Sequence, residues 1–291
     1  MKRLSGLFST PKITFQILSD LYLNYEQQYL TFHIPVSAPY LILAGNVGQL
    51  ADYDAYLSFL VRRCNLYEKV FLILGALEFH GLTHAEGLQL AHHMEEEVAT
   101  RGRLQILHRT RVDVPHTNVT LLGCTLWSNI PESAEAAVVK KAPEFDTMEG
   151  IRQWSVDNHN EEHFRDLAWL QGEINGPRTF AGAESSSAPT SQVIVVSSFT
   201  PDLHHTLAPW QVHSPWCAAY GTDLLNGTDW NIVKYWVHGT TGRTGKAKRF
   251  GLKIVSNQRG RVGEEEKGIL EDNVPKKDKI DLFDVTKVIQ V

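Results

Sequence analysis

The chain has 291 residues, 43% of them hydrophobic and 21% charged, which is enough to bury one large core or two small ones. Its 28 Lys and Arg residues stand against 33 Asp and Glu residues, giving a formal net charge of −5. Because this balance produces no strong field, we expect neither nucleic acid nor a membrane surface as a partner. No stretch reaches the roughly 18 apolar residues of a membrane span, and residues 1–11 lack the apolar run of a signal peptide.

The three cysteines, Cys64, Cys124 and Cys217, are widely spaced. An odd number without a Cys-x-x-Cys pair argues against a disulfide framework and against a zinc or redox centre of that type. A reducing compartment suits such a chain best. We therefore expect the protein in the cytoplasm or the nucleus.

Apolar runs of strand length alternate with segments of helical spacing. The expected strands are Ile13–Leu18, Tyr40–Leu43, Val70–Leu74, Val119–Leu122, Val193–Val196, Tyr235–Val237 and Leu252–Val255. The expected helices are Asp52–Cys64, His84–Ala99 and Asn160–Ile174, the last with an apolar stripe of Phe164, Leu167 and Leu170. This alternation predicts an α/β layered domain.

Two segments interrupt the pattern, and we expect a single domain of residues 1–291 that contains both. Residues 175–192 include three consecutive serines with Gly, Ala and Pro, which predicts a flexible surface insertion. Residues 262–291 begin with a charged stretch and continue with strand-like alternation over Ile280–Val291. This C-terminal tail is therefore expected to be rich in strands.

Several expected strands end in a short polar or Gly-containing turn. The turns read Ser19-Asp20-Leu21-Tyr22, Gly45-Asn46, Gly75-Ala76-Leu77-Glu78, Ser197-Ser198-Phe199-Thr200-Pro201 and Gly239-Thr240-Thr241-Gly242. Because ligands bind at the carboxyl ends of the strands in an α/β sheet, these turns should converge on one site. In order and spacing they resemble the calcineurin-like metallophosphoesterases. Segments outside the turns, at residues 122–127, 158–160, 166–170, 221–224 and 256–260, also resemble family members, especially fungal-type ones, so the resemblance covers residues 13–261.

The resemblance implies a four-layer α/β/β/α sandwich of two packed mixed sheets with helices outside. In that family the turns read SDxH, GD, GNH[DE] and GHTH, with a further His before a Pro. They hold two divalent metals, such as Mn, Fe or Zn, which clamp a phosphate and activate a bridging water. The resemblance therefore implies a metal-dependent hydrolase wherever those residues are kept.

This chain keeps a single strong ligand of the pattern, Asp20. Tyr22 stands for a His, Asn46 for the bridging Asp, Ala76 for Asn, Leu77 for the catalytic His, and Ser198, Thr240 and Gly242 for the remaining His ligands. A neutral Asn cannot offset the repulsion of two dications, and a Leu cannot protonate a leaving group. We therefore predict no metal site, no cofactor, and absent or very weak metal-dependent phosphoesterase activity.

Four histidines lie close to these turns in the sequence: His80, His204, His205 and His238. They could serve a relocated single-metal site. Histidines at strand ends are also ordinary polar edge residues, and a transition metal needs defined geometry rather than proximity. A relocated site therefore stays an alternative that the fold must decide.

Residues 239–246 superficially suggest a phosphate-binding loop. The spacing Gly-x5-Gly-Lys is one residue too long, and Ala247 stands where a Ser or Thr would bind magnesium. We expect instead a solvated loop with a basic cluster of Arg243, Lys246, Lys248 and Arg249.

The leading hypothesis is a pseudo-phosphoesterase that binds or regulates, with an unknown small molecule or protein as its partner. The candidate residues of the vacated cleft are Asp20, Tyr22, Asn46, Glu78, Ser198, Thr240 and His238. One alternative is a metal-free enzyme acting on a small organic substrate, with Asp20 and Tyr22 as acid and base and with Ser198 and Thr240 as oxyanion donors. A further alternative is residual hydrolysis of phosphoesters.

Overall fold

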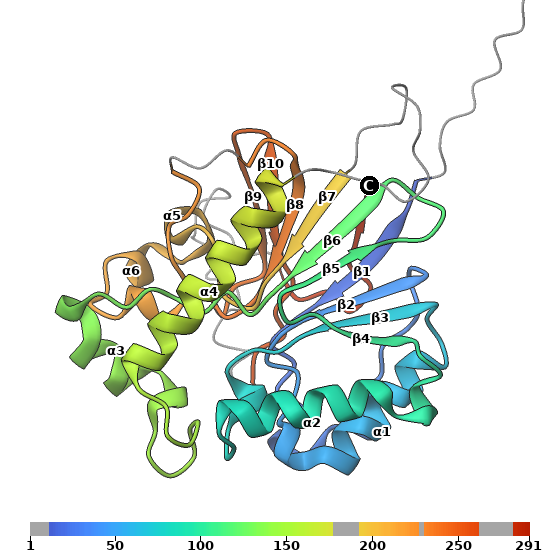
Figure 1. The fold of residues 1–291 in the computed structure, drawn as a ribbon, viewed down its shortest axis with the longest axis horizontal. Helices are drawn as coiled ribbons and strands as arrows, with labels where there is room; N and C mark the ends of the chain where they lie inside the picture. Colours follow the sequence, from blue (N-terminus) through green and yellow to red (C-terminus); the bar gives the residue numbers. More distant parts are fainter. Residues whose placement is uncertain (1–11, 177–191, 227–229, 262–281) are drawn as a thin grey trace, which may run out of the picture.

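The computed structural model describes residues 12–176, 192–226, 230–261 and 282–291. They form two sheets that lie face to face with helices on the outer sides (Figure 1). The first sheet has the order β11-β1-β2-β3-β4, formed by Val288–Gln290, Thr14–Leu18, Tyr40–Ala44, Lys69–Ile73 and Leu104–Ile106. The second has the order β5-β6-β7-β8-β10-β9, formed by Thr110–Asp113, Val119–Gly123, Gln192–Val196, Val233–His238, Leu252–Ser256 and Gly245–Arg249.

Parallel pairing dominates both sheets. Strands β1 to β4 pair in parallel, as do β6, β7, β8 and β10. Strands β11, β5 and β9 are antiparallel and lie at sheet edges. Because parallel neighbours end at the same edge of a sheet, the turns after β1, β2 and β3 lie together, as do those after β7 and β8.

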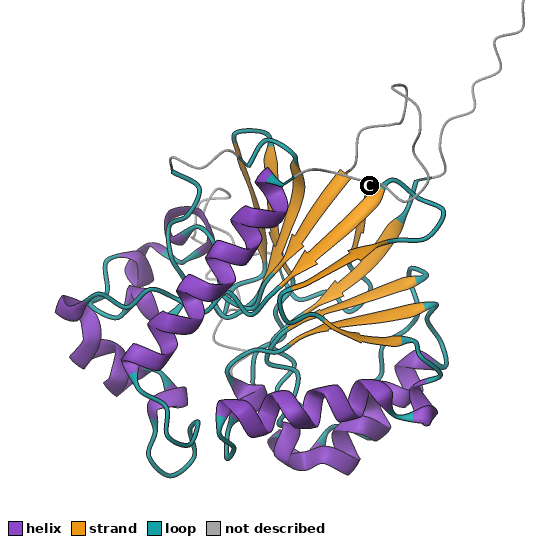
Figure 2. Ribbon diagram, in the orientation of Figure 1, coloured by secondary structure: helices purple, strands orange, loops and turns teal. Residues whose placement is uncertain are grey.

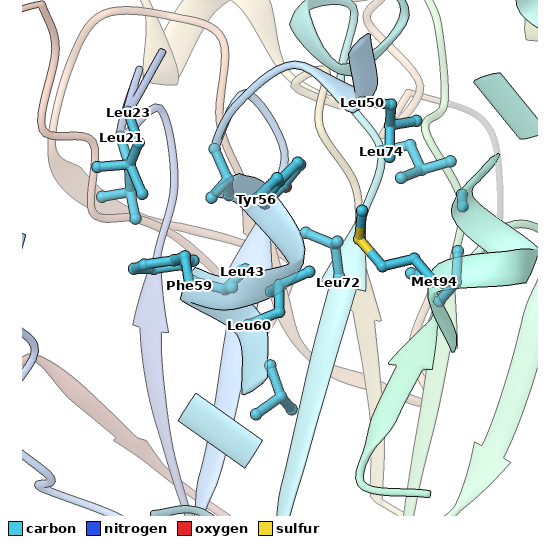
Figure 3. Close-up of a cluster of buried hydrophobic side chains, with 14 of the residues drawn as sticks. Leu21, Leu23, Leu43, Leu50, Tyr56, Phe59, Leu60, Leu72, Leu74 and Met94 are labelled. Atoms are coloured by element: carbon cyan, nitrogen blue, oxygen red, sulfur yellow. The ribbon is translucent and has the colours of Figure 1, made fainter. Parts of the chain in front are cut away.

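Alternating side chains on β2 show the layers. Leu41 and Leu43 pack in the outer cluster with α1 (Tyr53–Cys64) and α2 (His84–Glu96), part of which is drawn in Figure 3. Ile42 and Ala44 instead face the second sheet. The far side of that sheet packs against α4 (Val156–Asn175), and Figure 2 shows helices on both outer faces. The expected four-layer α/β/β/α sandwich is confirmed.

Capping side chains set where two of the long helices begin. Thr83 and Glu86 form a reciprocal capping box at the start of α2, which begins at His84 as expected. Ser155 and Asn158 form an equivalent box, so α4 begins four residues earlier than expected. On α4 the predicted stripe is partly wrong, because Phe164 is 55% exposed.

Three strands have no counterpart in the sequence prediction: β4, β5 and β9. Strand β4 has only three residues, and β9 reads Gly-Lys-Ala-Lys-Arg, without an apolar run. Exposed lysines are typical of edge strands, because they discourage pairing with another chain. Strand β9 lies at an edge, and its Lys246 and Lys248 are exposed.

The two segments singled out in the sequence lie largely outside the described residues. Asn175 ends α4 and Gln192 begins β7, and residues 177–191 between them are not described. Of the C-terminal tail, residues 282–291 are described, and strand β11 within it pairs with β1. The remaining helices are α3 (Glu135–Lys141), α5 (Leu203–Thr206) and α6 (Pro209–Val212). Within the described ranges, no helix combines the length and apolar character needed to cross a membrane.

Candidate functional site

Four side chains after β1, β2, β7 and β8 form one hydrogen-bonded group, which we call the strand-end cluster: Asp20, Asn46, Ser198 and Thr240. The Asn46 amide nitrogen Nδ2 donates to Asp20 Oδ1 at 2.9 Å and to Thr240 Oγ1 at 3.3 Å. Ser198 Oγ lies 3.2 Å from Thr240 Oγ1. The strand-end turns therefore converge, as the sequence predicted.

The orientation of the Asn46 amide follows from its neighbours. The backbone N–H of Leu77 donates to Asn46 Oδ1 at 3.1 Å, which turns the NH₂ group toward Asp20 and Thr240. An amide nitrogen has no lone pair to offer a cation. The two N–H donors of the Asn46 amide thus lie where the family resemblance predicts a bridging carboxylate.

Asp20 is 2% exposed, and both of its carboxylate oxygens accept hydrogen bonds. The backbone N–H of Thr240 lies 3.2 Å from Oδ1 and 3.1 Å from Oδ2. Burial raises the pKa of Asp20 to about 6, while hydrogen bonds from Asn46, Ser19, Thr240 and Tyr22 oppose that rise. Asp20, the one residue that keeps a metal-ligand type of the family pattern, therefore links the turns after β1, β2 and β8 through hydrogen bonds.

The backbone at the cluster is left-handed at several residues other than glycine. The φ angles are 53° at Asp20, 49° at Tyr22, 53° at Asn46 and 67° at Thr240. Asn46 tolerates this conformation, because Asn adopts left-handed angles in turns more readily than most residues other than glycine. Such conformations are unfavourable for the β-branched Thr240, and strained residues of this kind often mark functional sites.

Close approach of the turns leaves no room for side chains at two glycines. A Cβ on Gly45 would lie 2.4 Å from Ser198 Oγ, and a Cβ on Gly75 would lie 2.5 Å from Asn46 Oδ1. The strand-end cluster is therefore closely packed and encloses no cavity at these two glycines.

Glu78 does not line the cleft. It is fully buried, and its carboxylate accepts hydrogen bonds from the backbone N–H groups of Asn46, Val47, Gly48 and Gly75 at 2.9, 2.8, 3.4 and 2.8 Å. The Tyr56 hydroxyl donates a fifth bond at 3.1 Å. Burial raises the pKa of Glu78 to about 7, against these donors. Glu78 thus holds the turns after β2 and β3 together through their backbone N–H groups and does not face the cleft.

The donor set at the strand ends does not fit a dinuclear metal site. Asp20 is the single carboxylate of the cluster, and its oxygens are engaged by N–H donors. The other positions carry hydroxyl, amide, methyl and isobutyl groups and, at Gly242, no side chain, and neutral weak donors cannot compensate two dications. Over the described residues, no group of three or more His, Cys, Asp or Glu side chains is placed to hold a metal ion.

A cleft of about 380 Å³ opens at the strand-end cluster. Asn46, Thr240, Ala76 and Leu77 line it, and Asp20 and Ser198 lie behind these residues rather than in the lining. Aromatic side chains add to the lining, namely Tyr22, Phe199 and Tyr220. The volume falls in the range of small-molecule pockets, about 300–1,000 Å³.

Sequence reasoning missed part of this cleft, because its outer lining comes from segments without a motif. Lys141 ends α3, Glu144 follows it, and Gln211 lies on α6. Arg261 also lines the cleft, with its guanidinium carbon 5.5 Å from the ring centroid of Tyr22. The segment Ser256–Gly260, which resembles family members, was the one sequence signal close to Arg261.

Two titratable groups in the cleft have pKa values displaced in opposite directions. His80 is 7% exposed, and burial lowers its pKa to about 4, aided by the positive charge of Arg261. Glu144 is 4% exposed, and burial raises its pKa to about 7. Near neutral pH the lining of the cleft therefore includes a neutral imidazole and a carboxyl that is partly protonated.

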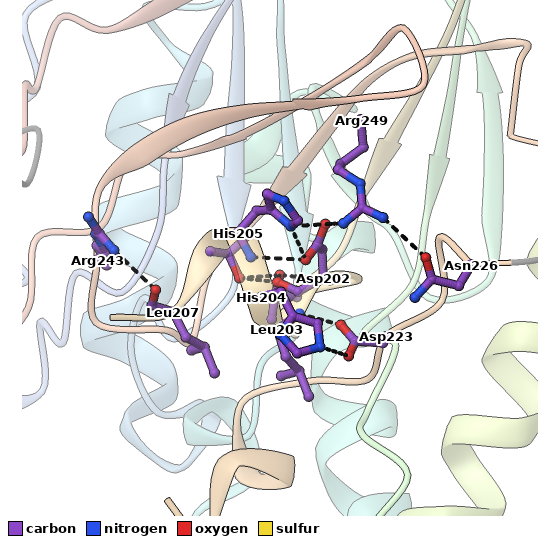
Figure 4. Close-up of polar contacts among 11 residues, drawn as sticks. Asp202, Leu203, His204, His205, Leu207, Asp223, Asn226, Arg243 and Arg249 are labelled. Carbon is purple, nitrogen blue, oxygen red and sulfur yellow. Dashed lines mark hydrogen bonds and ion pairs between the residues drawn. The ribbon is translucent and has the colours of Figure 1, made fainter. Parts of the chain in front are cut away.

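The other three histidines lie elsewhere, and the prediction that His238 belongs to the cleft is wrong. Strand alternation directs His238 to the face of the second sheet that carries Trp236, away from the first sheet. His204 contacts Asp223 at 3.3 Å, and His205 contacts Asp202 at 3.0 Å (Figure 4). His80 alone of the four lines the cleft.

Comparisons with known proteins support the fold. The crystal structure of phosphopantetheinyl hydrolase from Mycobacterium tuberculosis matches with a TM-score of 0.63 and 14% identity, covering 96% of both chains. A putative 5′-nucleotidase from Staphylococcus aureus matches at 0.46 with 12% identity, covering 86% of this chain and 49% of that chain, which is too distant to support a conclusion.

In sequence, the uncharacterized protein L509 of Acanthamoeba polyphaga mimivirus is 21% identical over 226 residues, 76% of this chain and 78% of that protein. No protein-family model matches the chain. The structural likeness to the hydrolase, together with two mixed sheets flanked by helices, shows that this chain has a metallophosphoesterase-like fold.

Proposed function

We propose that this chain is a pseudo-phosphoesterase, a metallophosphoesterase-like domain that binds a small organic molecule in its cleft and does not hydrolyse phosphoesters. The observation that carries the proposal is the Asn46 amide, whose NH₂ group faces Asp20 and Thr240 where a bridging carboxylate would be needed. We also propose that the chain is a fungal-type member of the calcineurin-like metallophosphoesterases and that it is located in the cytoplasm or the nucleus.

The cleft lining favours a small, partly apolar ligand with an anionic group. Tyr22, Phe199 and Tyr220 offer aromatic surface, and Lys141 and Arg261 offer positive charge. Within the described ranges, no carboxylate forms an ion pair with Lys141 or Arg261. Such cations are suited to pair with an anionic group of a ligand.

Aryl phosphate hydrolysis tests the proposal. We expect wild-type protein with added Mn²⁺ to show only background turnover, which chelation leaves unchanged, because the cluster cannot activate a water. The matched control is Asp20→Asn, which removes the one retained ligand type. Turnover that is lost both on chelation and in Asp20→Asn would overturn the proposal and support residual hydrolase activity.

A metal-free enzyme is the second candidate, favoured by the opposed pKa displacements of His80 and Glu144. A neutral base and a partly protonated acid in one cleft can serve acid–base chemistry on an organic substrate. In this second candidate function, His80 and Glu144 are the base and the acid, in place of Asp20 and Tyr22, which the sequence suggested for these roles. NMR titration is expected to give a pKa well below 6 for His80 and well above 5 for Glu144, and ordinary values for both would remove its support.

A further inference from the structure

A second cavity, of about 250 Å³, lies on the outer face of the second sheet. It is lined by residues of α5, β8, β9 and β10 and of the turn before β9. His238 lines it, on the same side of β8 as Trp236 and therefore away from the first sheet. No residue of this cavity lines the cleft at the strand-end cluster. We call it the outer cavity.

The charged side chains of the outer cavity are basic. Arg243 and Lys246 line it with His205 and His238, and no Asp or Glu is in the lining. One Arg243 nitrogen donates to the carbonyl of Leu207 at 3.0 Å (Figure 4), and neither Arg243 nor Lys246 forms an ion pair within the described residues. The nearby carboxylate of Asp202 is already paired with Arg249 at 3.1 Å. The cavity therefore offers positive charge without an internal anion.

His238 gives the outer cavity a buried acceptor. The residue is 1% exposed, and its Nδ1 lies 3.0 Å from the carbonyl oxygen of Gly239. A carbonyl only accepts, so Nδ1 carries the proton and Nε2 of the neutral ring presents a lone pair. Burial lowers the pKa of His238 to about 4, which keeps the ring neutral. Within the described residues, no hydrogen bond is made to Nε2.

The hydroxyl groups of the other lining residues, Thr206, Thr244 and Ser256, donate their hydrogen bonds elsewhere. Ser256 Oγ donates to the carbonyl of Arg243 at 2.8 Å, and Thr244 Oγ1 donates to the carbonyl of Gln258 at 3.0 Å. Thr206 Oγ1 donates to the carbonyl of Asp202. A ligand that displaces water from the outer cavity would match its lining if it brought acceptors for the cations and one donor for His238.

We propose that the outer cavity binds a phosphate-sized oxyanion that keeps an O–H group, held by Arg243 and Lys246 and donating its proton to a hydrogen bond with His238 Nε2. Inorganic phosphate has both properties at neutral pH, whereas sulfate has the charge without the O–H. The volume suits such an anion better than a nucleotide, because pockets for larger ligands begin at about 300 Å³. Arg243 and Lys246, two of the four residues in the basic cluster expected to be solvated, thus take part in a binding site.

The test is a titration of the full chain with inorganic phosphate at constant ionic strength, followed by NMR shifts of the Gly245 and Lys246 amides. We expect saturable binding that weakens at least about tenfold in Arg243→Met and about fivefold in Lys246→Met, because each loses a charge-assisted hydrogen bond. Sulfate should bind about fivefold more weakly than phosphate, since it offers His238 no donor. Circular dichroism confirms that each variant is folded.

Two control variants distinguish the outer cavity from other basic surfaces of the chain. Lys248→Met removes the same charge from the same strand outside the cavity lining, and Arg261→Met removes a cation from the cleft. Both should leave phosphate affinity within about twofold of wild type. No saturable shift at Gly245, equal weakening by Lys248→Met, or loss of binding only in Arg261→Met would each overturn the outer-cavity site. None of these results depends on the proposed function of the cleft.

Discussion

Replacement of Glu78 by alanine is expected to lower the free energy of unfolding by at least about 4 kcal/mol, or to prevent folding altogether. Four backbone N–H groups and the Tyr56 hydroxyl would lose their common acceptor. Each buried polar group left without a partner costs about 1–3 kcal/mol. Urea unfolding of the wild type and the variant measures the difference.

Two further variants make this expectation specific. Glu78→Gln keeps the shape and one oxygen acceptor, so its cost should be smaller, about 2–3 kcal/mol. Glu96→Ala removes an exposed carboxylate at the end of α2 and should change stability by less than about 0.5 kcal/mol. A Glu78→Ala protein as stable as the Glu96→Ala protein would show that the turns do not depend on this carboxylate.

Asn46→Asp is expected to destabilise the fold in a pH-dependent way. The new carboxylate would lie beside Asp20, where the amide nitrogen now donates at 2.9 Å. Below pH 5 one of the two acids stays protonated and can replace the lost donor, so the cost should be about 1 kcal/mol. The pKa of Asp20 is already raised to about 6, so ionisation of both acids above that pH is resisted. At pH 8 we expect a cost of about 3 kcal/mol.

The sign of this pH dependence is fixed by proton binding. A carboxyl pair with a raised pKa in the folded state binds more protons than in the unfolded state, so its stability contribution is lost as the pH rises. The control is Asn175→Asp, which adds the same charge at the exposed end of α4 and should show no such trend. Equal destabilisation by Asn46→Asp at pH 5 and pH 8 would contradict the tight contact with Asp20.

The sequence predicted the layers and the convergence of the strand ends well, because both follow from local patterns. Apolar runs such as Tyr40–Leu43 mark strands buried on both faces, and parallel order brings their ends together. The substitution at Asn46 was also readable from its turn. What could not be read was the direction of its amide, because that direction depends on Leu77, 31 residues away.

The errors in the site have two physical causes. The closeness of His238 to Gly239 in the sequence suggests a place in the cleft, whereas the period of two along β8 places it with Trp236 on the opposite face. The position of Glu78 in a polar turn suggests the same cleft, whereas its carboxylate accepts hydrogen bonds from buried backbone donors of two turns. Lys141 and Arg261 line the cleft but belong to segments outside the strand-end turns, and no local sequence pattern in those segments predicts a site.

The number of metal ions bound per chain tests the central claim most directly. Wild-type protein, purified without chelator and then incubated with Mn²⁺, would be analysed by elemental analysis beside the Asn46→Asp variant. We expect less than about 0.2 metal ions per chain in both, because one restored carboxylate does not replace the other missing ligands. One or two tightly bound metals in the wild type would contradict the account, and binding that appears only in Asn46→Asp would show that the remaining residues still fit a metal.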